Sequence, residues 1–304
     1  MIKPTYLQKG DTIAIVAPAG VIKNNNSIHE ADELVTNWGL HVLIGEHVFD
    51  NYHHFSATDE NRKNDFQKAL DNPNIKAIWC ARGGYGTVRI IDDLNFDIFK
   101  KSPKWIIGYS DITVLHNHLN SLGFETIHGM MPVNVEFPKE KRKESVRTLK
   151  LALFGELDSY TIPSSTYNKT GKASGALVGG NLTLLENLLG SPSSIDTKGK
   201  ILFFEEIGEY KYHIDRLLQG LKRNGYFDHC SGIIVGGMSH IKKNNPSYGQ
   251  CIEELILDII PQKNIPIIFD FPAGHDPENR ALYLGRNIEI NVNTTASTIK
   301  FINK

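Results

Sequence analysis

The chain has 304 residues, of which 40% are hydrophobic and 22% are charged, so it holds enough apolar material for two domains or one large α/β domain. Its formal net charge of −1 excludes a global field that would attract nucleic acid or an anionic membrane surface. The three cysteines form no CxxC pattern, which argues against a disulfide framework or a zinc site, and we interpret each as a small buried hydrophobe.

The sequence lacks the patterns of a signal peptide, a membrane span and a metal site. The first residues have no apolar core of a signal peptide, and no apolar run reaches the length of a membrane span. His53 and His54 are adjacent, but no acidic or cysteine partner stands at ligand spacing, so they are interpreted as solvated loop residues. We therefore expect a cytoplasmic protein with no metal, no other cofactor, and no nucleic-acid or membrane partner.

The N-terminal part alternates short apolar runs with amphipathic helical patterns, which predicts a parallel sheet with helices on both faces. Ser27 and Glu30 are typical of a capping box at the start of the first helix, and Gly39 suits its end. In chain order we expect strands at 12–17, 41–44, 75–80 and 105–107, and helices at 27–39, 66–70, 88–94 and 112–122.

The composition changes after Pro132. A densely charged stretch at 139–150 carries a narrow apolar stripe and predicts a surface helix that bridges two domains, and a polar stretch at 161–170 suits a boundary. We predict a first domain at 1–136, a helical linker at 137–165 and a second domain at 166–304. In the second domain we expect strands at 175–181, 201–204, 232–237, 267–269, 283–284 and 288–290, and helices at 184–189, 214–221 and 252–260.

Ser110 stands between the strand that starts at Trp105 and the helix that starts near Ile112. A serine on a sharp strand-to-helix turn holds its hydroxyl above the carboxyl edge of the sheet, beside unpaired helix N–H groups. That placement suits a nucleophile. Serine is also a favoured helix N-cap, so the same pattern fits a structural role. The surrounding residues depart from G-x-S-x-G, because Ile112 replaces the second glycine.

A serine nucleophile needs a base, and the base needs an acid that orients it. His275 differs from the other histidines because it follows an apolar strand directly, on a loop at the strand's carboxyl end. Glu205 ends another apolar strand, beside Glu206. Each of these two carboxylates is either a cap for the next helix or the group that orients an imidazole, and the local pattern alone favours the cap for both.

The loop after the third strand contains Gly83 and Gly84. Its backbone N–H groups are candidates for an oxyanion hole together with that of Asp111. A phosphate-binding role is the alternative, but neither G-x-x-x-x-G-K-[ST] nor G-x-G-x-x-G is present. Arg82 precedes the glycines, where its guanidinium either pairs with a substrate carboxylate or forms a structural salt bridge.

Taken together, these motifs resemble the LD-carboxypeptidase family, which includes muramoyl-tetrapeptide carboxypeptidases and microcin immunity proteins. The matching segments occur in order along nearly the whole chain. They are residues 14–20 (AIVAPAG), 78–86 (IWCARGGYG), 107–113 (IGYSDIT), 128–129 (HG), 179–182 (GGNL), 202–206 (LFFEE), 214–216 (IDR) and 274–275 (GH).

The resemblance implies a catalytic triad in which Ser110 is the nucleophile, His275 the base and Glu205 the acid. It also implies that the backbone N–H groups of Gly84 and Asp111 form the oxyanion hole. The implied fold has an N-terminal flavodoxin-like domain with a doubly wound parallel sheet and a second α/β domain with a small mixed sheet or barrel. A homodimer is usual in the family.

The implied reaction releases terminal D-alanine from cytoplasmic murein tetrapeptides by serine catalysis. Two alternatives stay open at this point. One is a hydrolase of the microcin immunity type that cleaves peptidyl- or aminoacyl-nucleotides. The other is a non-catalytic protein that binds a small ligand at the glycine loop. The sequence does not indicate whether the substrate's diamino acid is lysine or diaminopimelate.

Overall fold

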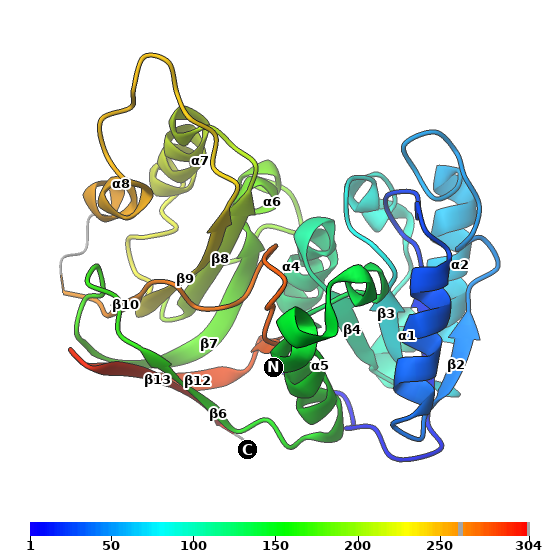
Figure 1. Cartoon of the computed structure of the whole chain (residues 1–304). Coiled ribbons are helices and arrows are strands. Elements are labelled where there is room, and N and C mark those ends of the chain that lie inside the picture. The colour runs from blue at the N-terminus through cyan, green and yellow to red at the C-terminus, as the bar shows by residue number, and fades with distance from the viewer. Residues whose placement is uncertain (261–263, 303–304) are drawn as a thin grey trace.

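The computed structural model describes residues 1–260 and 264–302, which fold around two neighbouring β-sheets (Figure 1). The first sheet has the strand order β11-β5-β4-β3-β1-β2. Its strands β1 to β5 run parallel, whereas β11 pairs antiparallel with β5. These strands are β1 (Thr12–Val16), β2 (His41–Ile44), β3 (Ile75–Cys80), β4 (Trp105–Gly108), β5 (Thr126–His128) and β11 (Leu282–Leu284).

The order of the five parallel strands is 2-1-3-4-5, the doubly wound order of flavodoxin-like folds, so the expected class of the first sheet is confirmed. Helices cover both of its faces because buried apolar strands need packing partners on each side. One face packs against α2 (Asp59–Asp71), α3 (Asp97–Lys101) and α4 (Thr113–Ser121), and the other against α1 (Asn26–Thr36) and α5 (Lys139–Phe154).

The second sheet is mixed, with the order β10-β9-β8-β7-β12-β13-β6. Strands β7 to β10 run parallel, and the other neighbours are antiparallel. The strands are β6 (Ser159–Pro163), β7 (Gly171–Asn181), β8 (Ile201–Ile207), β9 (Gly232–Ser239), β10 (Ile267–Ile268), β12 (Asn287–Val292) and β13 (Ala296–Phe301). One face of this sheet packs against α6 (Leu182–Asn187), α7 (Lys211–Arg223) and α8 (Ile252–Ile259).

A single apolar cluster joins the two sheets. It contains Ile107 and Ile127 of the first sheet together with Phe203 and Ile234 of the second, all fully buried. Figure 1 shows α4 and α5 in the region between the two sheets. The carboxyl ends of β4 and β8 therefore approach each other across a shared core. Because β11 returns to the first sheet from late in the chain, the two halves are also joined by strand pairing.

Several local expectations differ from the structure. The helix α1 begins at Asn26 with no side-chain cap, and Ser27 is buried and donates its hydroxyl to the Asn24 carbonyl, so the predicted capping box is wrong. Two short 3-10 turns, Thr87–Arg89 and Ile91–Asp93, replace the helix expected at 88–94.

Three strands were not expected: β5, which has only three residues, and the longer strands β6 and β13. Both of the longer strands alternate buried and exposed residues, and their polar outward side chains made them look like connecting segments. The bridging helix predicted at 139–150 is present as α5, and it ends at Gly155 in the left-handed conformation. None of the described helices is both long and apolar enough to cross a membrane.

Candidate active site

Ser110 lies two residues after the end of β4, at the carboxyl edge of the first sheet. Its φ of 62° is in the left-handed region, which non-glycine residues occupy rarely and chiefly where function requires it. The preceding residue Tyr109 is extended, and a 3-10 turn of Ser110–Ile112 then leads into α4. The expected strand–Ser–helix turn is therefore present.

Ser110 is hydrogen-bonded to His275, which is in turn hydrogen-bonded to Glu205, although the three residues come from distant parts of the chain. The Nε2 atom of His275 lies 3.0 Å from the Oγ of Ser110, and its Nδ1 lies 2.7 Å from the Oε2 of Glu205. Figure 1 shows the orange segment after β10, which carries His275, running from the second sheet towards α4. The geometry is that of a nucleophile, a base and an orienting acid in one hydrogen-bonded line.

Glu205 is completely buried near the end of β8. Its Oε1 accepts a hydrogen bond of 3.2 Å from the side-chain amide of Asn181, which closes β7, so both carboxylate oxygens have partners. Gly274 packs directly against this carboxylate, because a Cβ at that position would lie 2.8 Å from Oε2. The φ of 137° at Gly274 also favours glycine. The site thus holds the acid rigidly behind the imidazole.

Glu206 has the structural role that its neighbour lacks. Its Oε2 accepts hydrogen bonds from the backbone N–H and the hydroxyl of Thr183, in the first turn of α6. Burial, followed by repulsion from Glu205, raises the pKa of Glu206 above the usual range of a glutamate despite these hydrogen bonds. Glu206 therefore caps α6, whereas Glu205 is the carboxylate in contact with His275, and its role in orienting that imidazole stays a prediction.

The charge balance around His275 favours the imidazolium. Burial disfavours that cation, but attraction and hydrogen bonding to Glu205, with smaller contributions from Glu206 and Asp276, outweigh burial and raise the pKa of His275. The buried ring of Tyr109 stacks edge-on at 4.9 Å between ring centroids, which excludes water from one side of the imidazole. The site can therefore accept a proton from a hydroxyl and stabilise the resulting cation.

The glycine loop approaches the serine closely. A Cβ on Gly83 would lie 2.9 Å from the Cβ of Ser110 and 3.4 Å from the backbone nitrogen of Asp111, so only glycine fits there. Within the described part of the chain, the backbone N–H groups of Gly84 and Asp111 donate to no other group. Asp111 directly follows the serine and Gly84 directly follows the glycine that packs on it, so both free donors belong to segments that adjoin Ser110, and their role as an oxyanion hole stays a prediction.

Two anchors hold the loop in this position. The carboxylate of Asp111 accepts the Thr87 N–H at 2.8 Å, which ties the loop to the serine turn. Burial raises the pKa of Asp111, although the Thr87 hydrogen bonds oppose this. The buried guanidinium of Arg62 donates to the carbonyls of Pro18 and Gly86, linking the loop to the one after β1.

Arg82 is half-buried, and its guanidinium donates to the carbonyl of Val21 at 2.7 Å. No ion pair involves Arg82 among the residues that the structure describes, so the salt-bridge alternative lacks a carboxylate partner. Burial raises the pKa of the neighbouring Tyr109 to about 12, and the positive charge of Arg82 makes a smaller contribution that opposes this rise. A cation therefore lies close to the serine turn.

Sequence reasoning assigned no role to Asn181, Asn279 or His128. Asn181 lies in the GGNL motif at 179–182, and its position at the end of a predicted strand was the signal that could have identified it. Asn279 carries no local signal, because its partners Gly274 and His128 are brought to it only by the fold.

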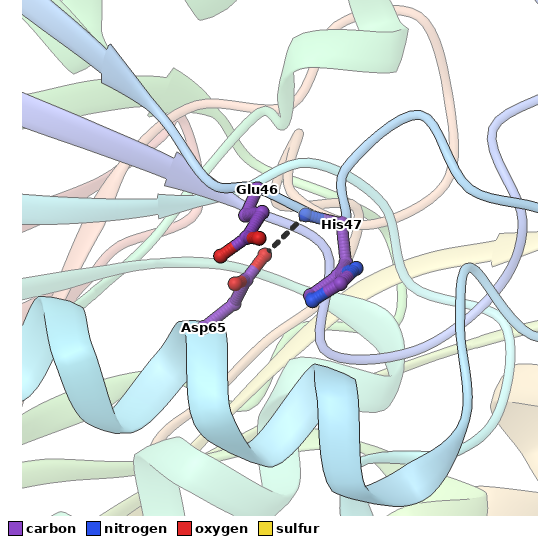
Figure 2. A group of neighbouring side chains, drawn as sticks. All are labelled: Glu46, His47 and Asp65. Carbon is purple, nitrogen blue, oxygen red and sulfur yellow. Dashed lines mark hydrogen bonds between the residues drawn. The ribbon is translucent and has the colours of Figure 1, made fainter.

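A group of possible metal ligands lies elsewhere, where Glu46 and His47 follow β2 and meet Asp65 of α2 (Figure 2). Local contacts already occupy much of it. Asp65 accepts the backbone N–H of His47 at 2.7 Å, and Glu46 pairs with Lys68 at 2.8 Å. The imidazole Nδ1 of His47 is hydrogen-bonded to the carboxylate of Asp50. These contacts suit a structural link between β2 and α2, and the expectation of no metal stays a prediction.

Comparison with known proteins identifies the family of the chain. Residues 13–129 match the family model described as the LD-carboxypeptidase N-terminal domain, and residues 174–290 match that of its C-terminal domain. A probable murein peptide carboxypeptidase of Bacillus subtilis is 32% identical over 98% of this chain and 94% of its own length. A murein tetrapeptide carboxypeptidase of Pseudomonas aeruginosa is 28% identical over 90% of this chain and 91% of its own.

Solved structures give the same result. A muramoyltetrapeptide carboxypeptidase from Oxalobacter formigenes superposes with a TM-score of 0.85 at 26% identity, covering 96% of this chain and 99% of its own. An MccF-like protein from Bacillus anthracis gives a TM-score of 0.88 at 26% identity, covering 99% and 100%.

The matches to the family models and to named carboxypeptidases place the chain in the class of serine-type hydrolases. More specifically, the chain belongs to the LD-carboxypeptidase family, and it is a serine-type carboxypeptidase. The resemblance stated from the sequence motifs is confirmed.

Proposed function

We propose that this enzyme releases terminal D-alanine from murein tetrapeptides by cleaving the bond between the L-centre of the diamino acid and that D-alanine. The observation that carries the proposal is the line from Ser110 through His275 to Glu205, with distances of 3.0 Å and 2.7 Å. The murein peptide and murein tetrapeptide carboxypeptidases among the relatives support this substrate class.

In the proposed acylation step, the Oγ of Ser110 attacks the scissile carbonyl carbon, and Nε2 of His275 accepts the hydroxyl proton. The carbonyl π-electrons move to oxygen, and the N–H groups of Gly84 and Asp111 stabilise that oxyanion. Collapse of the intermediate breaks the C–N bond, and the imidazolium gives its proton to the leaving amine of D-alanine. Glu205 keeps the hydrogen of the neutral imidazole on Nδ1, so that Nε2 is free to act as the base.

Deacylation repeats these transfers with water as the nucleophile. His275 takes a proton from the water, the hydroxide attacks the Ser110 ester, and the serine oxygen leaves with that proton. An oxyanion-hole donor of this kind is typically worth about 3–4 kcal/mol of barrier, so the glycine loop contributes to the rate as well as to the shape of the site.

For the terminal carboxylate of the substrate we propose Arg82 as the partner. The absence of an ion pair to this half-buried guanidinium, within the described residues, leaves its charge available beside the serine turn. A carboxypeptidase must distinguish a chain end from an internal peptide bond, and a fixed cation provides that distinction.

A second candidate is hydrolysis of an aminoacyl-nucleotide, which the close structural match to an MccF-like protein favours. The two functions share the triad and differ in what is released. The test compares D-alanine release from a murein tetrapeptide with cleavage of an aminoacyl sulfamoyl-adenosine by the same preparation. A kcat/KM at least a hundredfold higher for the tetrapeptide supports the carboxypeptidase, and the reverse order overturns it in favour of the nucleotide hydrolase.

We further propose that the enzyme acts in the cytoplasm as a homodimer with domains at 1–136 and 166–304 joined by a linker at 137–165. The family resemblance supports the dimer. The path of the chain supports the linker, because α5 packs on the first sheet and the strand that follows it, β6, belongs to the second sheet. Light scattering coupled to size-exclusion chromatography tests the dimer, because a mass of about one chain at working concentration contradicts it.

A further inference from the structure

His128 is a buried histidine that the proposed mechanism does not use. It ends β5, next to the end of β4, and its side chain is fully inaccessible to solvent. Its Nε2 lies 3.1 Å from the side-chain Oδ1 of Asn279. The same oxygen accepts the backbone N–H of Gly274 at 3.0 Å. One amide oxygen thus joins the first sheet to the loop that carries His275.

The hydrogen-bond polarity of this junction can be assigned. The Gly274 N–H can only donate, which requires the oxygen of the Asn279 amide at this position. That oxygen can only accept, so Nε2 of His128 carries its hydrogen. Burial lowers the pKa of His128 to about 3, so the ring is neutral under ordinary conditions. Two donors therefore converge on one acceptor, and neither needs a charged state.

This junction controls the backbone next to the base. Gly274 immediately precedes His275, and its α-carbon packs on Glu205, where a Cβ would lie 2.8 Å from Oε2. Asn279 is itself held from outside the loop, because its N–H donates to the hydroxyl of Ser145 on α5 at 2.7 Å. A shift of Asn279 would therefore change the position of the imidazole between its two partners.

The ring of His128 also contacts segments that carry the other two members of the line. It packs edge-on against Phe203, with 4.9 Å between centroids, two residues before Glu205 in β8. It packs at 5.8 Å against Tyr109, which directly precedes Ser110. The side chain of His128 thus contacts a residue beside Ser110 and a residue near Glu205. Through Asn279 it is also linked to Gly274, the residue before His275.

We propose that His128 is a positioning residue that, through Asn279, holds His275 in register with Ser110 and Glu205. This inference rests on the proposed function, because it assigns the histidine a role in the alignment of that triad. His128 does not touch the reacting atoms in this account. Its contribution is to restrict the imidazole to the geometry in which proton transfer is productive.

The test uses three single variants. His128→Phe keeps an aromatic ring and removes the donor, whereas His128→Gln keeps a donor that can reach Asn279. The matched control is His116→Phe, because His116 is equally buried and hydrogen-bonded to Thr126 and the Gly108 carbonyl, without contact to Asn279. For each protein, kcat, KM, the melting temperature and the pKa of His275 by NMR are measured.

We expect His128→Phe to lower kcat roughly ten- to a hundredfold with little change in KM, as a small misplacement of a catalytic group does. The pKa of His275 should fall towards its ordinary value, because its contact with Glu205 loosens. The other charged and titratable groups near this imidazole, Glu206, Asp276 and Tyr109, are unchanged in the variant. His128→Gln should restore both readouts, and His116→Phe should lower the melting temperature without moving the His275 pKa.

The inference is overturned if His128→Phe, at equal folded fraction, keeps both the wild-type kcat and the wild-type His275 pKa. It is also overturned if His116→Phe changes these readouts equally, because the effect would then be general destabilisation. Failure of the proposed function looks different. In that case, wild-type turnover of the tetrapeptide is absent or independent of Ser110, while the NMR measurement still reports whether His128 positions the imidazole.

Discussion

Replacement of Glu205 by glutamine removes the negative charge on the triad and keeps the shape of the side chain. In the wild type, the carboxylate lies 2.7 Å from Nδ1 of His275 and is fully buried, so solvent screens it little. An opposite charge this close typically raises a histidine pKa by about one to three pH units, each worth about 1.4 kcal/mol. Without it, burial dominates and lowers the pKa.

The protonation state of His275 determines how the rate depends on pH. Catalysis needs neutral His275, so wild-type kcat/KM should fall as the pH drops through a His275 pKa that lies above 6.5. In Glu205→Gln this acidic limb should move to lower pH. The rate should nevertheless fall about 10⁴-fold, because a glutamine amide that donates to Nδ1 stabilises the tautomer with its hydrogen on Nε2, which cannot act as a base.

The assay is D-alanine release between pH 5 and pH 9, with Glu206→Gln as the matched control. Glu206 is an adjacent buried carboxylate that caps α6 and contributes less to the His275 pKa. The control should keep kcat within about tenfold of the wild type, since its interactions are structural. If Glu205→Gln retains more than about a tenth of the wild-type rate with an unmoved acidic limb, Glu205 does not orient the base.

Two further variants test the supports of the site. Gly83→Ala places a methyl group 2.9 Å from the Cβ of Ser110, so kcat should fall about a hundredfold and the overpacking should also lower the melting temperature. A wild-type kcat would show that the loop moves freely away from the serine. Arg286→Met leaves the buried carboxylate of Glu125 without its ion pair, whose contacts are 2.6 Å and 2.9 Å, and should cost about 3–5 kcal/mol of unfolding free energy. Denaturant titration measures this loss of unfolding free energy. The double variant with Glu125→Gln should recover part of it. Full stability of the single variant would mean that this ion pair does not hold β12 to the first sheet.

Strands β1 to β4 of the first sheet could be predicted from the sequence because they are apolar runs bounded by glycine or proline, whereas the three-residue strand β5 was missed. The same reasoning failed for β6 and β13, where buried residues alternate with residues that are wholly or partly exposed, most of them polar. A search for alternation rather than for apolar runs would have found Tyr160 and Ile162, the two buried residues of β6. The error at Ser27 has a different origin, since serine hydroxyls also donate to nearby carbonyls within turns.

The candidate site shows where local sequence information ends. Ser110 could be selected from its own segment, because the strand, turn and helix are contiguous. The pairing of Glu205 with His275 joins residues 70 positions apart, and the local pattern favoured a helix cap for both acidic residues. Only the family resemblance separated Glu205 from Glu206. Asn279 could not have been selected, because its partners on β5 and in the loop before His275 come together only in the folded chain.

The central claim is that Ser110 forms a covalent bond to the acyl group of the substrate. Intact-mass spectrometry of enzyme treated with a fluorophosphonate, followed by peptide mapping, tests this claim directly when it is paired with rapid-quench detection of the tetrapeptide acyl-enzyme. The account predicts one adduct per chain, on Ser110, and its loss in Ser110→Ala together with a fall of several orders of magnitude in D-alanine release. Near-normal release of D-alanine by Ser110→Ala, or an acyl group carried by another residue, would contradict it.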